Sequence, residues 1–172
     1  MENGNRIDMD VTGKGTDMKL KASVDYGVRA ILYLAVKNDT CSSREISDEM
    51  SVPRDYLIQL ALRLRNAGLI KARPGKNGGY MLARKTSEIT VGDILDAFDN
   101  DLKHVRQPMK KGSKASDSAL AVYEMHGMVT DSLEHYLSAI TVQDLMEVRE
   151  SGENANKTIA KALRREADRL EE

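Results

Sequence analysis

Two short helical patterns of apolar residues meet at Pro53. In the first pattern, Ile46 and Met50 are four residues apart and share one helix face, and Ser43 stands where a helix cap is expected. Proline lacks the amide hydrogen of a helix interior but suits a first turn, so Pro53 predicts a second helix over residues 53–66. The inner stripe of this second helix is predicted to consist of Leu57, Leu60, Ala61 and Leu64.

The other side of the second helix carries polar side chains that we expect to face solvent. They are Arg54, Asp55, Tyr56, Gln59 and Arg63. After Gly68, a residue type that often ends helices, residues 69–73 and 80–83 are predicted to form two strands around the turn-forming loop 74–79. Helix, turn, helix and hairpin together indicate a winged helix-turn-helix, whose second helix enters the major groove of DNA. The expected fold is therefore mainly α with a small β-hairpin wing.

Further helical patterns lie on both sides of this motif. Residues 23–37 are predicted to form a helix that packs beneath it, and Thr90 with Asp93 is predicted to cap a short helix ending at Phe98. Thr141 with Asp144 is predicted in the same way to cap one more helical turn over residues 141–146. The longest pattern runs over residues 116–140 and has a seam of the kind that pairs with a partner helix. The seam consists of Val122, Met125, Val129, Leu133, Tyr136 and Ile140. Because the winged domain is too small to cover such a helix, we expect a homodimer.

The polar and charged segments suggest where the domains begin and end. The expected organisation is a disordered N-terminal arm (1–17), a winged helix-turn-helix DNA-binding domain (18–100), a basic linker (101–115), a dimerisation helix and following turn (116–148) and a charged C-terminal helix or tail (149–172). The linker is interpreted either as a solvated loop or as a phosphate contact. The last segment is interpreted either as a solvated helix or as one that packs on the dimer or on another chain. Its thin apolar stripe consists of Ile159, Leu163, Ala167 and Leu170.

Charge is distributed unevenly along the 172 residues, although the net charge is only −1. Residues 18–87 hold 13 of the 26 Lys and Arg residues but only 6 of the 27 Asp and Glu residues. A basic segment that coincides with a helix-turn-helix favours contact with the phosphates of double-stranded DNA. The alternative hypothesis is a winged-helix protein-interaction module that uses its acidic C-terminal half.

Composition argues against several other classes of protein. No long apolar run or signal peptide is visible, so a cytoplasmic protein of bacterial type, without a membrane partner, is expected. Neither a phosphate-binding glycine loop nor a nucleophile–base arrangement occurs, so we expect no enzyme. The single cysteine, Cys41, excludes a disulfide framework within one chain. It is interpreted either as a small, half-buried packing residue or as a redox switch through a disulfide between protomers, which requires a lowered thiol pKa.

Five segments, in this order, resemble one known family. They are MKLKASVDYGVRAILYLA from residue 18, VPRDYLIQLALRLRNAG from residue 52, LIKARPGKNGGYML from residue 69, ITVGDILDA from residue 89 and ITVQDL from residue 140. Over about residues 18–148 the chain resembles the Rrf-two type winged-helix regulators of bacteria, which include the iron–sulfur cluster assembly regulator and the nitric-oxide-responsive repressor. The resemblance implies a homodimeric transcription regulator, most simply a repressor, that binds a palindromic operator.

In that family the recognition helix and the wing contact DNA. By position, these contacts fall on Pro53, Arg54, Asp55, Tyr56 and Gln59 in the helix and on Arg73, Lys76 and Asn77 in the wing, and Ser43 and Arg63 complete the predicted interface. Glutamine can bind adenine through two hydrogen bonds, arginine reads guanine, and tyrosine and lysine bind phosphate. Two departures from the family pattern predict an altered base preference: Pro74 replaces a common arginine, and Ile58 stands where some members carry glutamate.

The cluster ligands of the iron–sulfur members are missing here. Three family cysteines fall near Gln107, Ser113 and Ala119, and a further ligand place falls near Val122. None of these side chains replaces a thiolate at iron, and Asp25, which matches an acidic ligand of one branch, does not hold a cluster alone. We therefore predict no iron–sulfur cluster, no other cofactor and no metal. The signal is expected to be a small molecule near the junction of wing domain and long helix, a partner protein, or oxidation of the cysteine.

Overall fold

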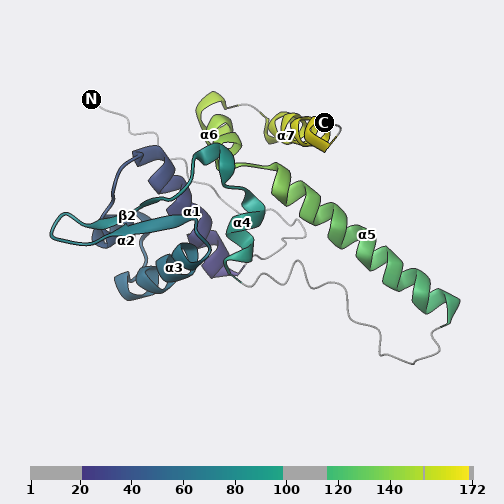
Figure 1. Cartoon of the computed structure of the whole chain (residues 1–172), viewed down its shortest axis with the longest axis horizontal. Helices are drawn as coiled ribbons and strands as arrows, with labels where there is room; N and C mark the ends of the chain where they lie inside the picture. The colour runs from purple at the N-terminus through teal and green to yellow at the C-terminus, as the bar shows by residue number, and fades with distance from the viewer. Residues whose placement is uncertain (1–20, 99–115, 153, 171–172) are drawn as a thin grey trace, which may run out of the picture.

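A computed structural model describes residues 21–98, 116–152 and 154–170 (Figure 1). The described part of the chain is mainly helical and holds one two-stranded antiparallel sheet, so the predicted fold class is confirmed. The predicted N-terminal arm and basic linker, with Gln107 and Ser113, lie outside the described residues.

Three helices form the centre of the N-terminal domain: α1 (Ala22–Lys37), α2 (Ser43–Met50) and α3 (Arg54–Asn66). The predicted inner stripe of α3 is buried together with Ile46 and Met50 of α2, so that α2 and α3 pack on each other and on α1. The cap of α2 was predicted one residue too late. Ser42 is the N-cap, and its side chain accepts a hydrogen bond from the Glu45 amide at 3.1 Å. Ser43 is thereby left free to contact a neighbouring helix.

The wing is a hairpin of β1 (Ile70–Arg73) and β2 (Gly79–Leu82), with Ile70 opposite Leu82. A third segment joins it, because Cys41 and Tyr80 exchange two backbone hydrogen bonds of 2.9 and 2.8 Å. Glycine is required at the crossing point. A Cβ on Gly79 would lie 2.1 Å from the Cys41 carbonyl oxygen. The hairpin is thus held against the start of α2.

After the wing come a 3-10 turn, η1 (Thr86–Glu88), and the helices α4 (Val91–Asp96), α5 (Asp117–Ala139) and α6 (Val142–Ser151). The related sequences ITVGDIL and ITVQDLM begin α4 and α6, and each forms a capping box, with Thr90–Asp93 and Thr141–Asp144. The two caps lie side by side because the segments pair as an antiparallel bridge, through two backbone hydrogen bonds of 2.8 Å. This bridge ties the end of α5 to the winged domain. The turn predicted over residues 141–146 is thus the start of a ten-residue helix.

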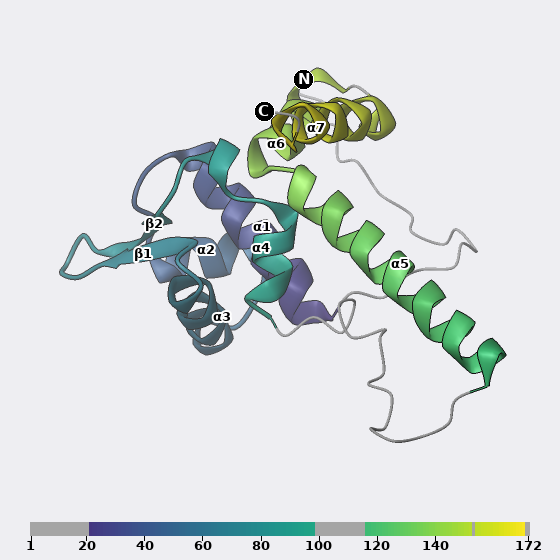
Figure 2. The same cartoon turned by 45° about the vertical axis from the view of Figure 1, so that its right-hand side comes forward.

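Helix α5 extends away from the winged domain as an arm (Figures 1 and 2). Its C-terminal end packs near α4, where a Cβ on Gly92 would lie 3.2 Å from Ser138 Oγ. Four of the six predicted seam residues are exposed, and Leu133 and Ile140 are partly buried. The exposed four are Val122, Met125, Val129 and Tyr136.

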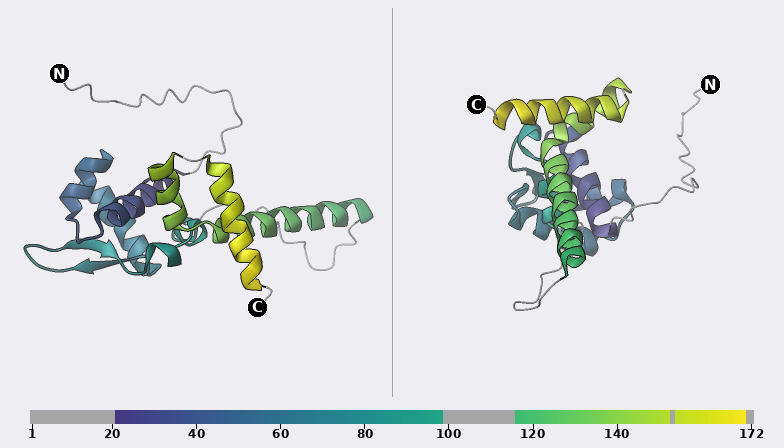
Figure 3. Two further views of the ribbon diagram at one scale, coloured as in Figure 1. Left: turned by 90° about the horizontal axis from the view of Figure 1, so that it is seen from above. Right: turned by 90° about the vertical axis from the view of Figure 1, so that its right-hand side faces the viewer.

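The last helix, α7 (Ala155–Leu170), crosses the end of α5 and packs on α5 and α6 (Figure 3). The interpretation of this segment as a fully solvated helix is wrong, because α7 packs on its own chain, whereas packing on a partner protomer or on another chain stays a prediction. Among the side chains of α7 that the structure describes, Thr158 and Ala162 are the most buried, Ile159 and Leu163 are partly buried, and Ala167 is exposed. Arg165 donates to both carboxylate oxygens of Asp144, at 3.0 and 2.8 Å, and to the Ala139 carbonyl at 3.0 Å. That anchor fixes which face of α7 turns inward.

Candidate nucleic-acid interface

A groove of about 400 Å³ lies between the start of α2, the first two turns of α3 and the wing. Its lining includes four of the predicted contact residues. They are Ser43, Arg54, Arg73 and Lys76. The groove therefore brings together residues that are up to 33 positions apart in the sequence, and three of the four are cationic.

The first turn of α3 is fixed by its neighbour. Pro53 is the N-cap of α3 and has an extended ψ of 134°, so the helix begins one residue after the predicted position. Arg54 Nε donates a hydrogen bond to Ser43 Oγ at 2.9 Å, which joins the first turns of α2 and α3. The side chains of Asp55, Gln59 and Arg63 are exposed along the outward face of α3, as predicted.

Tyr56 differs from the expectation of a solvent-facing side chain. It is half-buried, and its ring meets that of Tyr26 of α1 edge to face, with the centroids 6.0 Å apart and an interplanar angle of 85°. The Arg29 guanidinium lies 5.9 Å from the centroid of the Tyr26 ring. Tyr56 therefore also contributes to the packing of α3 on α1.

The wing loop presents Lys76 and Asn77, and Arg73 ends strand β1 just before it. All three side chains are exposed. Gly75 has a φ of +111°, a region that favours glycine, and a Cβ on Gly78 would lie 2.2 Å from the Arg73 carbonyl oxygen. These glycines give the loop its tight path and leave its backbone open to a close approach.

Two apolar residues of the same face were not among the predicted contact residues, although Ile58 was noted above as a departure from the family pattern. Ile58 and Leu62 are 41% and 48% exposed, although both are aliphatic. Ile58 lines the groove together with Arg54. Helical spacing places both residues away from the buried stripe of α3, so their exposure could have been predicted from the sequence.

Cys41 is buried in the winged domain, and its Sγ donates a weak hydrogen bond to the Asp39 carbonyl at 3.7 Å. Burial, together with the nearby charge of Glu45, raises the pKa of the thiol, which suppresses the reactive thiolate. These surroundings favour the packing interpretation of the cysteine. A redox role stays an untested prediction.

The described residues contain neither a cluster of metal-binding side chains nor a helix that could span a membrane. Within them, no group of three or more His, Cys, Asp or Glu side chains is placed to hold a metal ion. In the same part of the chain, no helix combines the length and the apolar character needed to cross a bilayer.

Comparison with known proteins identifies what the chain is similar to. The sequence model of a family named Rrf2, described as an iron-dependent transcriptional regulator, matches residues 20–148. The HTH-type transcriptional regulator IscR of Enterobacter sp. (strain 638) is 30% identical over 135 residues, which cover 77% of this chain and 82% of the relative.

Solved structures of transcriptional regulators are also similar to this chain. The IscR structure from T. potens has a TM-score of 0.62 and 30% identity, covering 81% of this chain and 93% of the other. The structure of CymR, the global cysteine regulator of B. subtilis, has a TM-score of 0.60 and 28% identity, and the match covers 74% of this chain and 95% of the CymR chain. These similar proteins are named as regulators and not as enzymes, in agreement with the sequence-based expectation.

Proposed function

Because the chain belongs to the Rrf2 family of DNA-binding transcriptional regulators, we propose that it is a homodimeric repressor of a palindromic operator. Each protomer inserts α3 into a major groove and sets the wing loop against the adjacent minor groove or backbone. A dimer bound in this way covers promoter DNA and competes with the transcription machinery for it.

The observation that carries this proposal is the basic groove between α2, α3 and the wing. It unites Arg54, Arg73 and Lys76 beside the outward face of a 13-residue helix. Phosphate contacts position a protein on a duplex, whereas side chains such as Gln59 on the outward face specify its sequence. The groove residues act in the first way and the exposed face of α3 in the second.

The proposed dimer rests on α5. Its seam leaves Val122, Met125, Val129 and Tyr136 exposed on an arm that the winged domain does not cover. Antiparallel or crossed packing of two such arms buries these side chains and sets two copies of α3 about one helical turn of DNA apart. We assign residues 18–100 to DNA binding and residues 116–148 to dimerisation.

The family description implies iron, but the residues present do not fit an iron–sulfur cluster. The chain has one cysteine, which is buried beside the wing, and the family's ligand places hold Gln107, Ser113, Ala119 and Val122. Thiolates are the usual protein ligands of such clusters. We therefore propose that the regulator responds to a signal other than a cluster.

A groove of about 560 Å³ between α1, α2 and α6 supports a small molecule as that signal. Apolar side chains such as Leu32, Val36 and Met146 line it, and the cations Arg29 and Arg149 lie at its edge. A compound bound there would touch both α2 of the DNA-binding motif and the helix that follows the dimer arm. A partner protein and oxidation of Cys41 are the other signals considered.

Titration of a labelled fragment of the protein's own promoter, at physiological salt, tests the proposal. We expect specific retention by the wild type and loss of specificity in Gln59→Ala with its circular dichroism spectrum unchanged. Tyr56→Phe is a better second variant than an alanine change, because it removes the hydroxyl and keeps the contact with Tyr26. A protein that ignores its promoter, but captures a partner through α5–α7, would replace the proposal with the protein-interaction alternative.

A further inference from the structure

Ile58 and Leu62 form an exposed aliphatic pair on the recognition helix. They are four residues apart, so they share one face of α3, and they are 41% and 48% exposed. The four buried side chains of α3 lie on the opposite face and are each at most 3% exposed. The hydrophobic core is thus complete without this pair, and their exposure needs another explanation.

The surroundings of the pair argue for a nucleic-acid partner. Ile58 lines the groove that also holds Arg54, Arg73 and Lys76. Leu62 lies one turn further along the same helix and is followed in the chain by the exposed Arg63. An apolar patch that binds protein is normally depleted of charge at its centre. Here cations border the pair, which fits an apolar contact made inside a negatively charged groove.

Only one base edge in unmodified DNA offers an apolar group in the major groove, namely the C5-methyl group of thymine. Building on the proposed DNA-binding function, we propose that Ile58 and Leu62 are specificity residues that contact thymine methyl groups. Residues four apart in a helix are separated by about 6 Å along its axis. That distance is close to two base steps of about 3.4 Å each, so the pair fits two thymines within about two base steps of each other.

An aliphatic residue at position 58 favours a different base from the one that an acidic side chain there would favour. A carboxylate in the major groove accepts a hydrogen bond from the amino group of cytosine. An aliphatic side chain accepts nothing and gains only by excluding water from another apolar group. The preferred base under this position is therefore thymine rather than cytosine.

The experiment begins with selection of high-affinity duplexes from a random library by the wild-type protein. Single thymines of the selected half-site are then replaced by deoxyuridine, which lacks only the methyl group. For the wild type we expect an affinity loss of about fourfold at each contacted thymine, the effect of one buried methyl. Ile58→Ala should abolish this loss at one thymine and Leu62→Ala at another, while Leu120→Ala, a comparably exposed aliphatic change on α5 and outside the groove, should abolish neither.

The possible outcomes distinguish a failure of the proposed methyl contacts from a failure of the proposed DNA-binding function. The proposed methyl contacts are wrong if the protein binds specific DNA but loses no affinity at any deoxyuridine. They are also wrong if the affinity loss is the same in the wild type and in both variants. Either result would leave the proposed DNA binding intact. Failure to select any sequence would instead overturn the proposed function. Because neither side chain belongs to the hydrophobic core, the variants should melt close to the wild-type temperature, so a change in binding reports the contact itself.

Discussion

Arg54 and Ser43 are joined by a hydrogen bond of 2.9 Å from Nε to Oγ, which couples α3, the proposed recognition helix, to α2. The four donors on the terminal guanidinium nitrogens take no part in this bond. The serine therefore restricts the motion of the arginine without using the part that binds phosphate or guanine. The side chain is positioned before DNA arrives.

Removal of this positioning should weaken DNA binding without unfolding the protein. For Ser43→Ala we expect an affinity loss of about two- to tenfold per protomer, the range of one hydrogen bond, and a larger loss for Arg54→Ala. Fluorescence anisotropy with the selected operator measures both. Ser87→Ala, an exposed serine after the wing, is the matched control. If Ser43→Ala binds as tightly as the control does, the bond has no role in recognition.

Lys76 in the wing loop is exposed, and we expect its ammonium group to bind phosphate rather than a base edge. We expect Lys76→Ala to weaken specific and non-specific duplexes by the same factor and to reduce the slope of log affinity against log salt by about one unit per protomer. Gln59→Ala should instead leave the slope unchanged and narrow the gap between specific and non-specific affinity. A Lys76→Ala effect limited to one sequence would show that the wing reads bases.

Much of this fold could be predicted from the sequence because local signals agreed with tertiary packing. Pro53 placed the start of α3 to within one residue, and the Thr90 and Thr141 caps were both correct. The pairing of those two caps was not predictable, since it joins segments about 50 residues apart through backbone atoms alone. The contact of Cys41 with Tyr80 escaped prediction for the same reason.

The sequence-based predictions were wrong where a side chain could fill either of two structural roles. Ser42 and Ser43 are both good caps, and only the position of Arg54 decides which one remains available. In α7 a buried carboxylate on α6 binds Arg165, and this polar contact between residues 21 positions apart is not visible in the local pattern. Tyr56 was assigned to solvent because the ring of Tyr26, 30 residues earlier, is not visible in a local pattern.

Gly79 should tolerate no side chain. Its Cβ would lie 2.1 Å from the Cys41 carbonyl oxygen, and backbone cannot move aside as a flexible side chain does. We expect Gly79→Ala to destabilise the domain by about 1–3 kcal/mol and to shift the wing away from α2, with loss of DNA affinity. Gly75→Ala is the comparison: its Cβ meets nothing within 4 Å, so only its positive φ is penalised. Equal melting temperatures for Gly79→Ala and the wild type would contradict the close approach.

The proposed dimer seam can be tested on two neighbouring residues of α5. Val129 lies on the seam and is 53% exposed, whereas Met128 is 70% exposed but rotated by about 100° around the helix. Val129→Asp should convert a dimer into a monomer at micromolar concentration, because a charge replaces an apolar contact. Met128→Asp introduces the same charge and should remain dimeric. Sedimentation equilibrium distinguishes the two, and a wild-type monomer would refute the seam altogether.

The anchor of α7 predicts a pH-dependent contribution to stability. Asp144 is 3% exposed at its side chain; burial by itself raises its pKa, but hydrogen bonds from Arg165 and Thr141 outweigh burial and hold the pKa below its usual value. A carboxyl with a lowered folded-state pKa stabilises the fold above its ordinary pKa, and this stabilisation is lost as the pH falls through the folded-state value. We therefore expect Arg165→Ala to cost about 1–3 kcal/mol near neutral pH. The difference from wild type should narrow once the pH falls below the ordinary carboxyl pKa of about 4, toward the lower folded-state pKa at which Asp144 is protonated. Thermal unfolding between pH 7 and pH 3 measures this difference.

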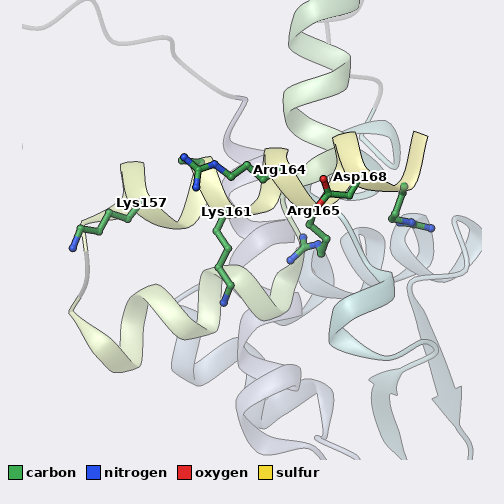
Figure 4. A pocket seen from close by; sticks show the side chains of 7 residues that line it. Lys157, Lys161, Arg164, Arg165 and Asp168 are labelled. Carbon is green, nitrogen blue, oxygen red and sulfur yellow. The ribbon is translucent and has the colours of Figure 1, made fainter. Parts of the chain in front are cut away.

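The control is Arg164→Ala, a change at an exposed arginine on the same helix (Figure 4), which should reduce the free energy of unfolding little at any pH. A difference for Arg165→Ala that does not change with pH would mean that the arginine acts by packing alone.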